Sequence, residues 1–156
     1  MRGIIANTKK SSHDGKDIVP IMEEILESGG QCRLKVTGYS MTPILKHKRD
    51  SVVLTTAKGK VLKRGDIVFI KRKSGEYVLH RVYKILENGF IMNGDAQTWT
   101  EFVEFDQVIG IISQINRNSK DISVNNLFYK FIVNIWMLLR PLRKIIFKTY
   151  GILRFK

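Results

Sequence analysis

The sequence predicts a mostly β fold of the α+β class: a compact antiparallel β domain with a short helix before it and a basic amphipathic helix after it. Runs rich in β-branched and aromatic residues, separated by turn signals, fill the middle of the 156-residue chain. Apolar residues at helical spacing precede this region and return after it. The length suits one sizeable core with appendages rather than two independent domains.

The first element expected is a short helix. Residues 1–16 are mainly polar and unpatterned, and we expect them to form a mobile leader. The next segment carries apolar residues at helical spacing, namely Ile18, Ile21, Met22 and Ile25. This spacing predicts a helix over 17–28, with Pro20 in its first turn and Gly29-Gly30 as its stop.

Six strands are expected next, at Arg33–Thr37, Ser51–Thr56, Asp66–Arg72, Glu76–Leu86, Gly89–Asn93 and Gln107–Ile115. Hairpin-type breaks at Lys73–Gly75 and Glu87–Gly89 favour antiparallel pairing. We assign residues 17–120 to this domain.

The residue pattern of the tail, residues 121–156, predicts an amphipathic helix with a break near Pro141. One face carries the apolar residues Phe131, Ile135, Leu138, Leu142 and Ile145, and the opposite side carries Lys130, Asn134, Lys144 and Lys148. The chain has a net charge of +13, and residues 127–156 contain no acidic residue. Two alternatives stay open: the apolar stripe packs on the β domain or a partner helix, or it lies on an anionic membrane, which we favour over nucleic acid as a partner.

Neither a metal nor a cofactor is expected. Cys32 has no second cysteine to pair with, and His13 and His47 lack partners at metal-ligand spacing. The glycines form no phosphate-binding loop. A secretory signal is not visible, and the longest apolar run, 131–139, is shorter than the roughly 20 residues that span a bilayer. We therefore expect a cytoplasmic protein, with peripheral membrane contact through the tail as an option.

Four short motifs point to chemistry: Gly38–Pro43, Lys63–Val68, Leu79–Val82 and Gly94-Asp95. The first places Ser40 on a tight turn, and the third places His80 inside an apolar strand. A serine hydroxyl is a weak nucleophile until a base takes its proton, and histidine is such a base. Taken singly, Ser40 would be an ordinary turn serine and His80 a half-buried structural histidine.

In this order the four motifs resemble those of the type I signal peptidase superfamily, which includes the self-cleaving repressors of the DNA-damage response. The resemblance covers about residues 33–115. It implies a β domain of the signal peptidase type in which Ser40 is the nucleophile. The base of this superfamily is lysine in most bacterial signal peptidases and in the repressors, and histidine in the endoplasmic reticulum and archaeal-like branch. Because it has His80 at this place, the chain resembles the second group.

The resemblance also implies a carboxylate that orients the histidine, either Asp95 or Glu101, and we favour Asp95. Gly38 lacks the hydroxyl with which some relatives stabilise the oxyanion, so backbone N–H groups near Ser40 would do so. Because neutral His80 is the active base, activity should rise as the pH passes its ordinary pKa of about 6.5. We expect Asp66 to cap a turn and Arg81 to form a structural ion pair.

The sequence therefore predicts a serine endopeptidase that cleaves a leader or signal-like peptide bound in extended form. One alternative is a self-cleaving regulator of the same superfamily, which the histidine base and the few residues before the domain do not favour. Another is a non-enzymatic basic β module that binds nucleic acid or membrane.

Overall fold

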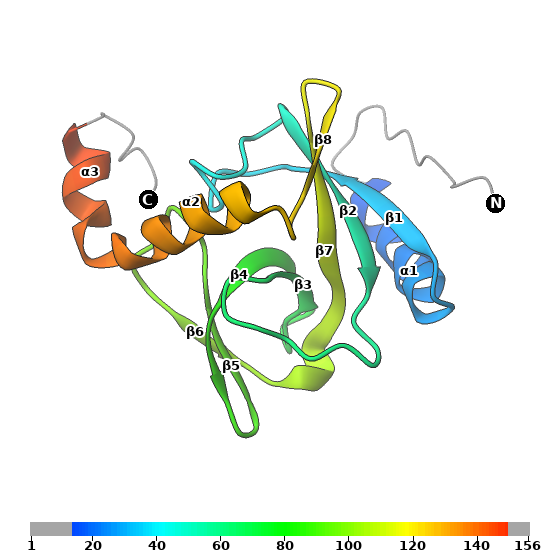
Figure 1. The fold of residues 1–156 in the computed structure, drawn as a ribbon. Coiled ribbons are helices and arrows are strands. Elements are labelled where there is room, and N and C mark those ends of the chain that lie inside the picture. Colours follow the sequence, from blue (N-terminus) through cyan, green and yellow to red (C-terminus); the bar gives the residue numbers. More distant parts are fainter. Residues whose placement is uncertain (1–13, 150–156) are drawn as a thin grey trace.

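The computed structural model describes residues 14–149, and the side chains of residues 18–149. Within this range the protein has an α+β fold, with an open antiparallel sheet of eight strands and three short helices (Figure 1). The helices are α1 (Asp14–Glu27), α2 (Leu127–Leu138) and α3 (Arg143–Thr149). The strands are β1 (Gln31–Lys35), β2 (Asp50–Thr56), β3 (Ile67–Lys71), β4 (Tyr77–Leu86), β5 (Gly89–Asn93), β6 (Glu101–Val103), β7 (Val108–Arg117) and β8 (Lys120–Ser123).

The strands follow the order β1-β2-β7-β3-β4-β5-β6, and β8 pairs with β7. β7 is the central strand, because one of its edges pairs with β2 while the other pairs first with β3 and then with β8. Register shifts interrupt the β2–β7, β3–β7 and β4–β5 pairings. Such irregularities bend the strands, and the sheet curls strongly around β3 and β4 (Figure 1).

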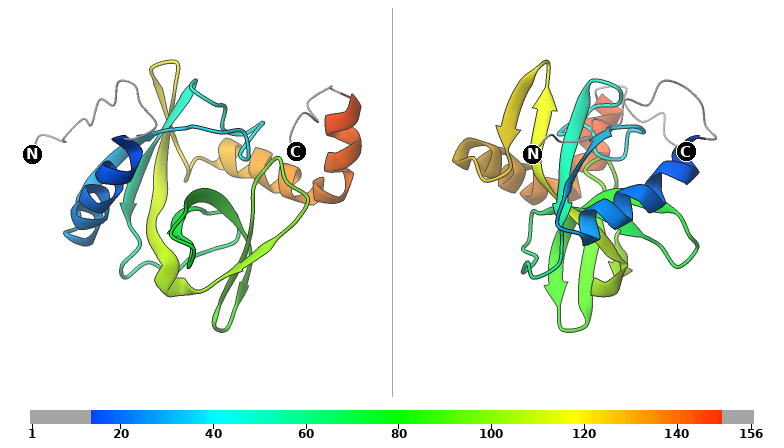
Figure 2. Two further views of the ribbon diagram at one scale, coloured as in Figure 1. Left: turned by 180° about the vertical axis from the view of Figure 1, so that it is seen from behind. Right: turned by 90° about the vertical axis from the view of Figure 1, so that its right-hand side faces the viewer.

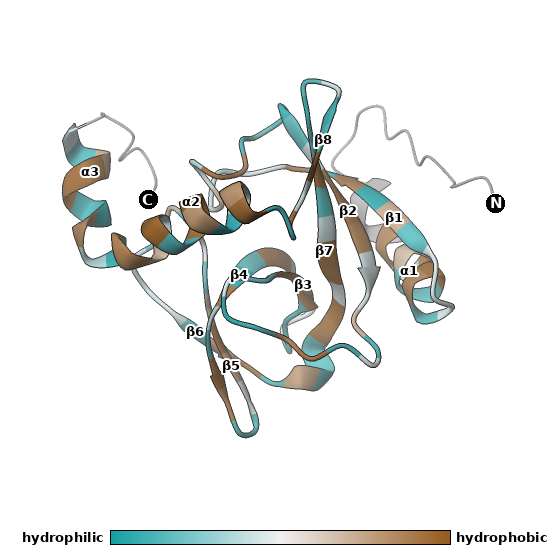
Figure 3. Cartoon of the chain, viewed as in Figure 1, coloured by the Kyte–Doolittle hydropathy of each residue, from teal (hydrophilic) through white to brown (hydrophobic). Residues whose placement is uncertain are grey.

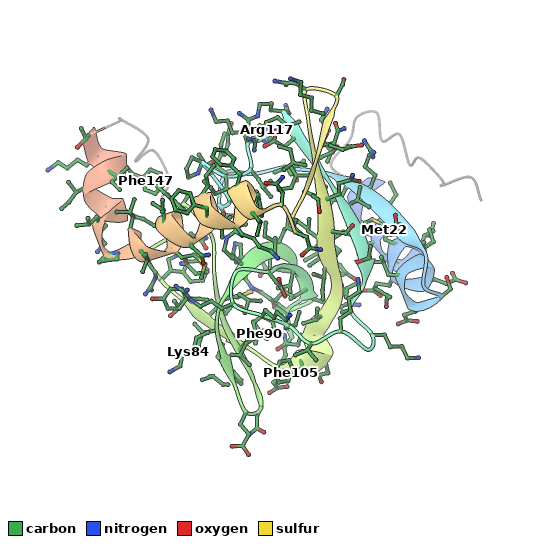
Figure 4. All side chains as sticks on the ribbon, viewed as in Figure 1. Met22, Lys84, Phe90, Phe105, Arg117 and Phe147 are labelled. Carbon is green, nitrogen blue, oxygen red and sulfur yellow. The ribbon has the colours of Figure 1, made fainter. Side chains whose placement is uncertain are left out.

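Two apolar cores lie on the two sides of β3, because successive side chains of a strand point to opposite faces. Ile67 and Phe69 belong to the core that α1 covers, whereas Val68 and Ile70 belong to a second core that also contains Phe90. Figure 3 shows the apolar residues along these strands, and Figure 4 shows Phe90 within the curled part of the sheet. β3 is therefore the strand that joins the two cores.

Helix α1 begins earlier than the sequence indicated. It starts at Asp14, so residues 14–16 of the expected leader are helical, and residues 1–13 lie outside the described part of the chain. Pro20 consequently lies inside the helix, where it removes one backbone hydrogen bond, rather than in the first turn. The helix packs against β1 and β2, at the opposite end of the molecule from α3 (Figure 2).

All six expected strands are present, with ends that differ by no more than two residues, and β5 has the expected bounds. Two strands were not expected, β6 and β8. Each is short and pairs with one neighbour, so its residues lack the long alternating pattern that marks a strand. β8 also extends the sheet beyond residue 120, the expected end of the domain.

The tail forms two helices separated by a 3₁₀ turn at Arg140–Leu142, which confirms the break near Pro141. Asn126 caps α2, since its side chain accepts hydrogen bonds from the backbone N–H groups of Phe128 and Tyr129. The apolar stripe of the tail does not pack on the β domain, which was one of the alternatives left open. The stripe that begins at Phe131 is exposed, and α2 packs on the domain through Val133 and Met137 instead.

Candidate active site

Ser40 lies in a tight turn between β1 and β2, as the glycine and proline around it predict. Gly38 has a φ of +86°, a left-handed conformation that favours glycine. Its N–H donates a hydrogen bond to Nδ1 of His47 at 2.9 Å, and the His47 ring contacts the Tyr39 ring with centroids 4.8 Å apart. The turn is thus fixed on both sides of Ser40, which is partly exposed.

A second turn, 94–96, lies directly against the first. The N–H of Ala96 donates a hydrogen bond to the carbonyl oxygen of Ser40 at 2.7 Å. A Cβ at position 94 would lie 2.7 Å from the same oxygen, so a side chain there would push the two turns apart. Gly94 is therefore required by this close approach, which brings the first and fourth sequence motifs together.

The backbone around Ser40 offers two free donors. Neither the N–H of Ser40 nor that of Met41 donates a hydrogen bond to another residue in the range 14–149. Adjacent backbone N–H groups of this kind can stabilise the negative oxygen of a tetrahedral intermediate. Their position fits the expected source of the oxyanion donors.

His80 is buried in β4, where it pairs with Val68 of β3. Only 3% of the residue is exposed, and its Nδ1 atom is enclosed without a hydrogen-bond partner in the described structure. The ring contacts the edge of Trp99, with centroids 6.2 Å apart. A buried polar atom without a partner is uncommon in folded proteins and costs stability. Nδ1 of His80 is thus enclosed within the protein and makes no hydrogen bond there.

The environment of His80 lowers its pKa to about 4. Burial is the largest cause, because it disfavours the charged imidazolium, and the positive charge of Arg72 acts in the same direction. Glu101 and Asp95 oppose this shift through their negative charges. The imidazole is therefore neutral at pH 7, which is the form a general base needs, although a lower pKa also makes it a weaker base.

Neither candidate carboxylate is bonded to His80. Both oxygens of Asp95 accept hydrogen bonds from Arg81, at 2.8 and 2.6 Å, in a pair that is almost completely buried. Both oxygens of Glu101 accept hydrogen bonds from Arg72, also at 2.8 and 2.6 Å. The structure places Asp95 and Glu101 near His80 electrostatically but gives neither the orienting hydrogen bond that the resemblance implies.

The buried ion pair of Arg81 confirms the structural role expected for this residue, and it joins three of the sequence motifs. Arg81 also donates to the carbonyl oxygen of Gly65 at 2.8 Å. Next to Gly65, Asp66 accepts a hydrogen bond from the N–H of Lys63 at 2.8 Å and so caps a turn, as expected. The motifs around residues 65, 81 and 95 therefore meet at one guanidinium group.

The tail helices hold the loop that follows β5, a feature that sequence reasoning missed. We call residues 93–98 the site loop. Arg143, which is 1% exposed, donates hydrogen bonds to the Asn93 side chain at 2.5 Å and to the carbonyl oxygens of Gly94 and Gln97 at 3.1 Å. The ring N–H of Trp136 donates to the Asp95 carbonyl oxygen at 3.0 Å. The site loop is thus fixed from the tail as well as from the sheet.

Arg143 gave no signal in the sequence because it is one of several basic residues in a helical tail. Its partners lie 46 to 50 residues away along the chain. In the structure Phe147 of α3 lies beside Trp136 of α2, with ring centroids 5.9 Å apart, and Arg143 at the start of α3 is buried. Only this packing distinguishes Arg143 from the exposed Lys144 beside it.

The structure therefore brings the turn of Ser40, the site loop and the strand of His80 into one region, through the contacts of Ala96 and Arg81. Ser40 and His80 are not hydrogen bonded to each other. Catalytic hydrogen bonds are often absent without substrate and form when it binds. The arrangement can supply a hydroxyl, a neutral imidazole and two free N–H donors.

Among residues 14–149, no three His, Cys, Asp or Glu side chains are grouped so that they could hold a metal ion. Within the same range, no helix has both the length and the apolar character required to cross a bilayer. A scan against protein-family models found no match for this chain, and a search of curated proteins found none either.

Proposed function

We propose that this protein is a serine endopeptidase with a domain of the signal peptidase type, and that it cleaves a leader or signal-like peptide. The observation that carries the proposal is the state of His80. It is buried, neutral at pH 7 and without a partner at Nδ1, beside a loop whose Ala96 N–H bonds the Ser40 carbonyl. The order of the four sequence motifs supports the same assignment.

In the proposed reaction, the Ser40 hydroxyl oxygen attacks the carbonyl carbon of the scissile peptide bond while His80 takes the hydroxyl proton. The N–H groups of Ser40 and Met41 stabilise the oxyanion. His80 then gives the proton to the leaving amine as the C–N bond breaks, and an acyl-enzyme remains. Water, activated by His80, hydrolyses this ester and restores the Ser40 hydroxyl.

Asp95 and Glu101 act indirectly in this proposal. Asp95 fixes Arg81, the neighbour of His80 in β4, and Glu101 fixes Arg72, whose charge lowers the pKa of His80. The catalytic groups would then be a Ser40–His80 dyad. The two carboxylates would be positioning residues whose loss reduces the rate without removing the nucleophile or the base.

The first test is cleavage of a mixed synthetic peptide library at pH 7, followed by mass spectrometry of the products. Ser40→Ala and His80→Ala should each lower the cleavage rate by roughly 1,000-fold or more, because each removes a group that acts in every turnover. Ser74→Ala is the matched control, since Ser74 is an exposed hairpin serine between β3 and β4. Its rate should equal that of the unmodified protein.

Circular dichroism and thermal unfolding should show that each variant remains folded. Full cleavage by folded Ser40→Ala or His80→Ala would contradict the proposed site. Absence of cleavage by the unmodified protein across the library, together with strongly salt-dependent nucleic-acid binding, would favour the non-enzymatic alternative.

A further inference from the structure

The outward side of α2 is apolar over the whole length of the helix. We call this surface the outer face; its residues are between 40% and 82% exposed, and they are Leu127, Phe128, Phe131, Ile132, Ile135 and Leu138. Figure 3 shows that apolar residues recur along α2. Large apolar side chains that are exposed together, rather than singly, mark an interaction site.

The outer face is not the side of α2 that packs on the domain. α2 already packs on the domain through Val133 and Met137, which are 4% and 2% exposed, and through Trp136. At 100° per residue, these side chains lie on the opposite side of the helix from Phe131 and Ile135. The helix therefore has two apolar sides, and the domain covers only one of them.

Exposed apolar side chains also occur beyond the helix break. Leu142 and Ile145 are 47% and 64% exposed, whereas Arg143 and Phe147 are buried. Apolar side chains thus remain exposed from the start of α2 into α3, while the inward side chains hold the site loop. Both tail helices therefore expose apolar side chains.

Charge identifies the partner. Asp121 is the last acidic residue of the chain, and Lys130, Lys144 and Lys148 are exposed on the two tail helices. Contact of this surface with the same surface of a second copy would bring these like charges together, which opposes association. An anionic bilayer complements both the apolar face and the exposed lysines of the same two helices.

We propose that the outer face of α2, with Leu142 and Ile145, docks in the plane of an anionic lipid bilayer. The apolar side chains enter the boundary between headgroups and acyl chains, and the lysines contact the anionic headgroups. This mode needs no membrane-spanning segment, because an amphipathic helix that lies in the interface binds through its apolar area and its positive charge.

The test uses the full chain and vesicles of phosphatidylcholine with or without phosphatidylglycerol, and the partition coefficient is measured by co-sedimentation. The unmodified protein should bind the anionic vesicles at least tenfold more tightly than the neutral ones. Phe131→Ser with Ile135→Ser should lower binding to anionic vesicles by at least tenfold. The matched control is Val61→Ser with Phe102→Ser, which removes two exposed apolar side chains elsewhere and should change binding less than twofold.

The charge component is tested separately. Substitution of Lys130, Lys144 and Lys148 by glutamine should lower binding to anionic vesicles roughly 100-fold at low salt, since each lysine accounts for roughly a fivefold change. Circular dichroism should show all variants folded, because every substituted side chain is exposed.

Three outcomes would overturn the proposal: no preference of the unmodified protein for anionic vesicles, equal loss of binding in the outer-face variant and its control, or unchanged binding of the lysine variant. A dimer in light scattering that the outer-face substitutions abolish, without vesicle binding, would assign the face to a second copy instead.

Discussion

The environment of His80 determines the pH dependence of the proposed reaction. Because the pKa of His80 is about 4, its imidazole stays neutral and active at pH values well below 6.5, the ordinary pKa of histidine. Cleavage should therefore remain nearly constant from pH 7 to about pH 5 and fall as the pH drops through about 4. The measurement is the initial rate against pH. Because the unfolded chain binds this proton at higher pH than the folded chain, stability also falls between these values, so circular dichroism must accompany each point.

Arg72 provides the matched test of this explanation. Its charge lowers the pKa of His80, and Glu101 raises it. Arg72→Met removes the lowering charge and leaves the carboxylate, so the acidic limb of the rate profile should move to higher pH. Lys73→Met removes a charge that pairs with Glu104 at the surface and should leave the limb in place. Equal profiles for the two variants would contradict an electrostatic role for Arg72.

Single residues were predictable where their role depends on the residues next to them. The turn of Ser40 and the cap of Asp66 belong to this group. The pair of Arg72 with Glu101 was not predictable, because these residues are 29 positions apart and meet only through the folded sheet. Arg72 thus binds Glu101, one of the two carboxylates that the resemblance implied as the partner of His80.

Among the elements, the sequence predicted strands with long alternating or apolar patterns and missed those that depend on a neighbour. β4 and β7 each contain ten residues and were identified, whereas β6 has three residues and β8 has four. Which side of α2 packs on the domain stayed open for a related reason. Apolar residues occur on both sides of this helix, so spacing alone could not show which side the domain covers.

Arg143 is the residue through which α3 stabilises the site loop. Arg143→Met would leave the buried oxygen atoms of Asn93, Gly94 and Gln97 without this donor. Lost partners of this kind cost about 1–3 kcal/mol, so the free energy of unfolding should fall by about 3 kcal/mol. Urea denaturation measures this change, with the exposed Lys144→Met as the control, expected within about 0.5 kcal/mol. Equal stability of the two variants would show that the contacts of Arg143 are dispensable.

At the scale of the whole molecule, the tail links the proposed site to the proposed membrane surface. The outward side of α2 carries the outer face, and its inward side donates from Trp136 to the backbone of Asp95. A groove of about 570 Å³ lies between α2 and the end of the Ser40 turn, lined in part by Pro43, Ile44, Phe128 and Ile132. A bilayer bound to the outer face would therefore lie near the entrance to this groove, because Phe128 and Ile132 belong to both.

This dual role predicts that removal of the tail destabilises the domain. A chain that ends at Asn126 would lose the buried side chains of Val133, Met137 and Phe147 together with the donors to the site loop. The free energy of unfolding should fall by about 3 kcal/mol or more, measured by urea denaturation. In contrast, Phe131→Ser with Ile135→Ser changes only exposed side chains and should alter stability by less than about 1 kcal/mol. If the truncated chain were as stable as the full chain, the tail would be a separate appendage, and docking of the outer face could not orient the region of Ser40 and His80.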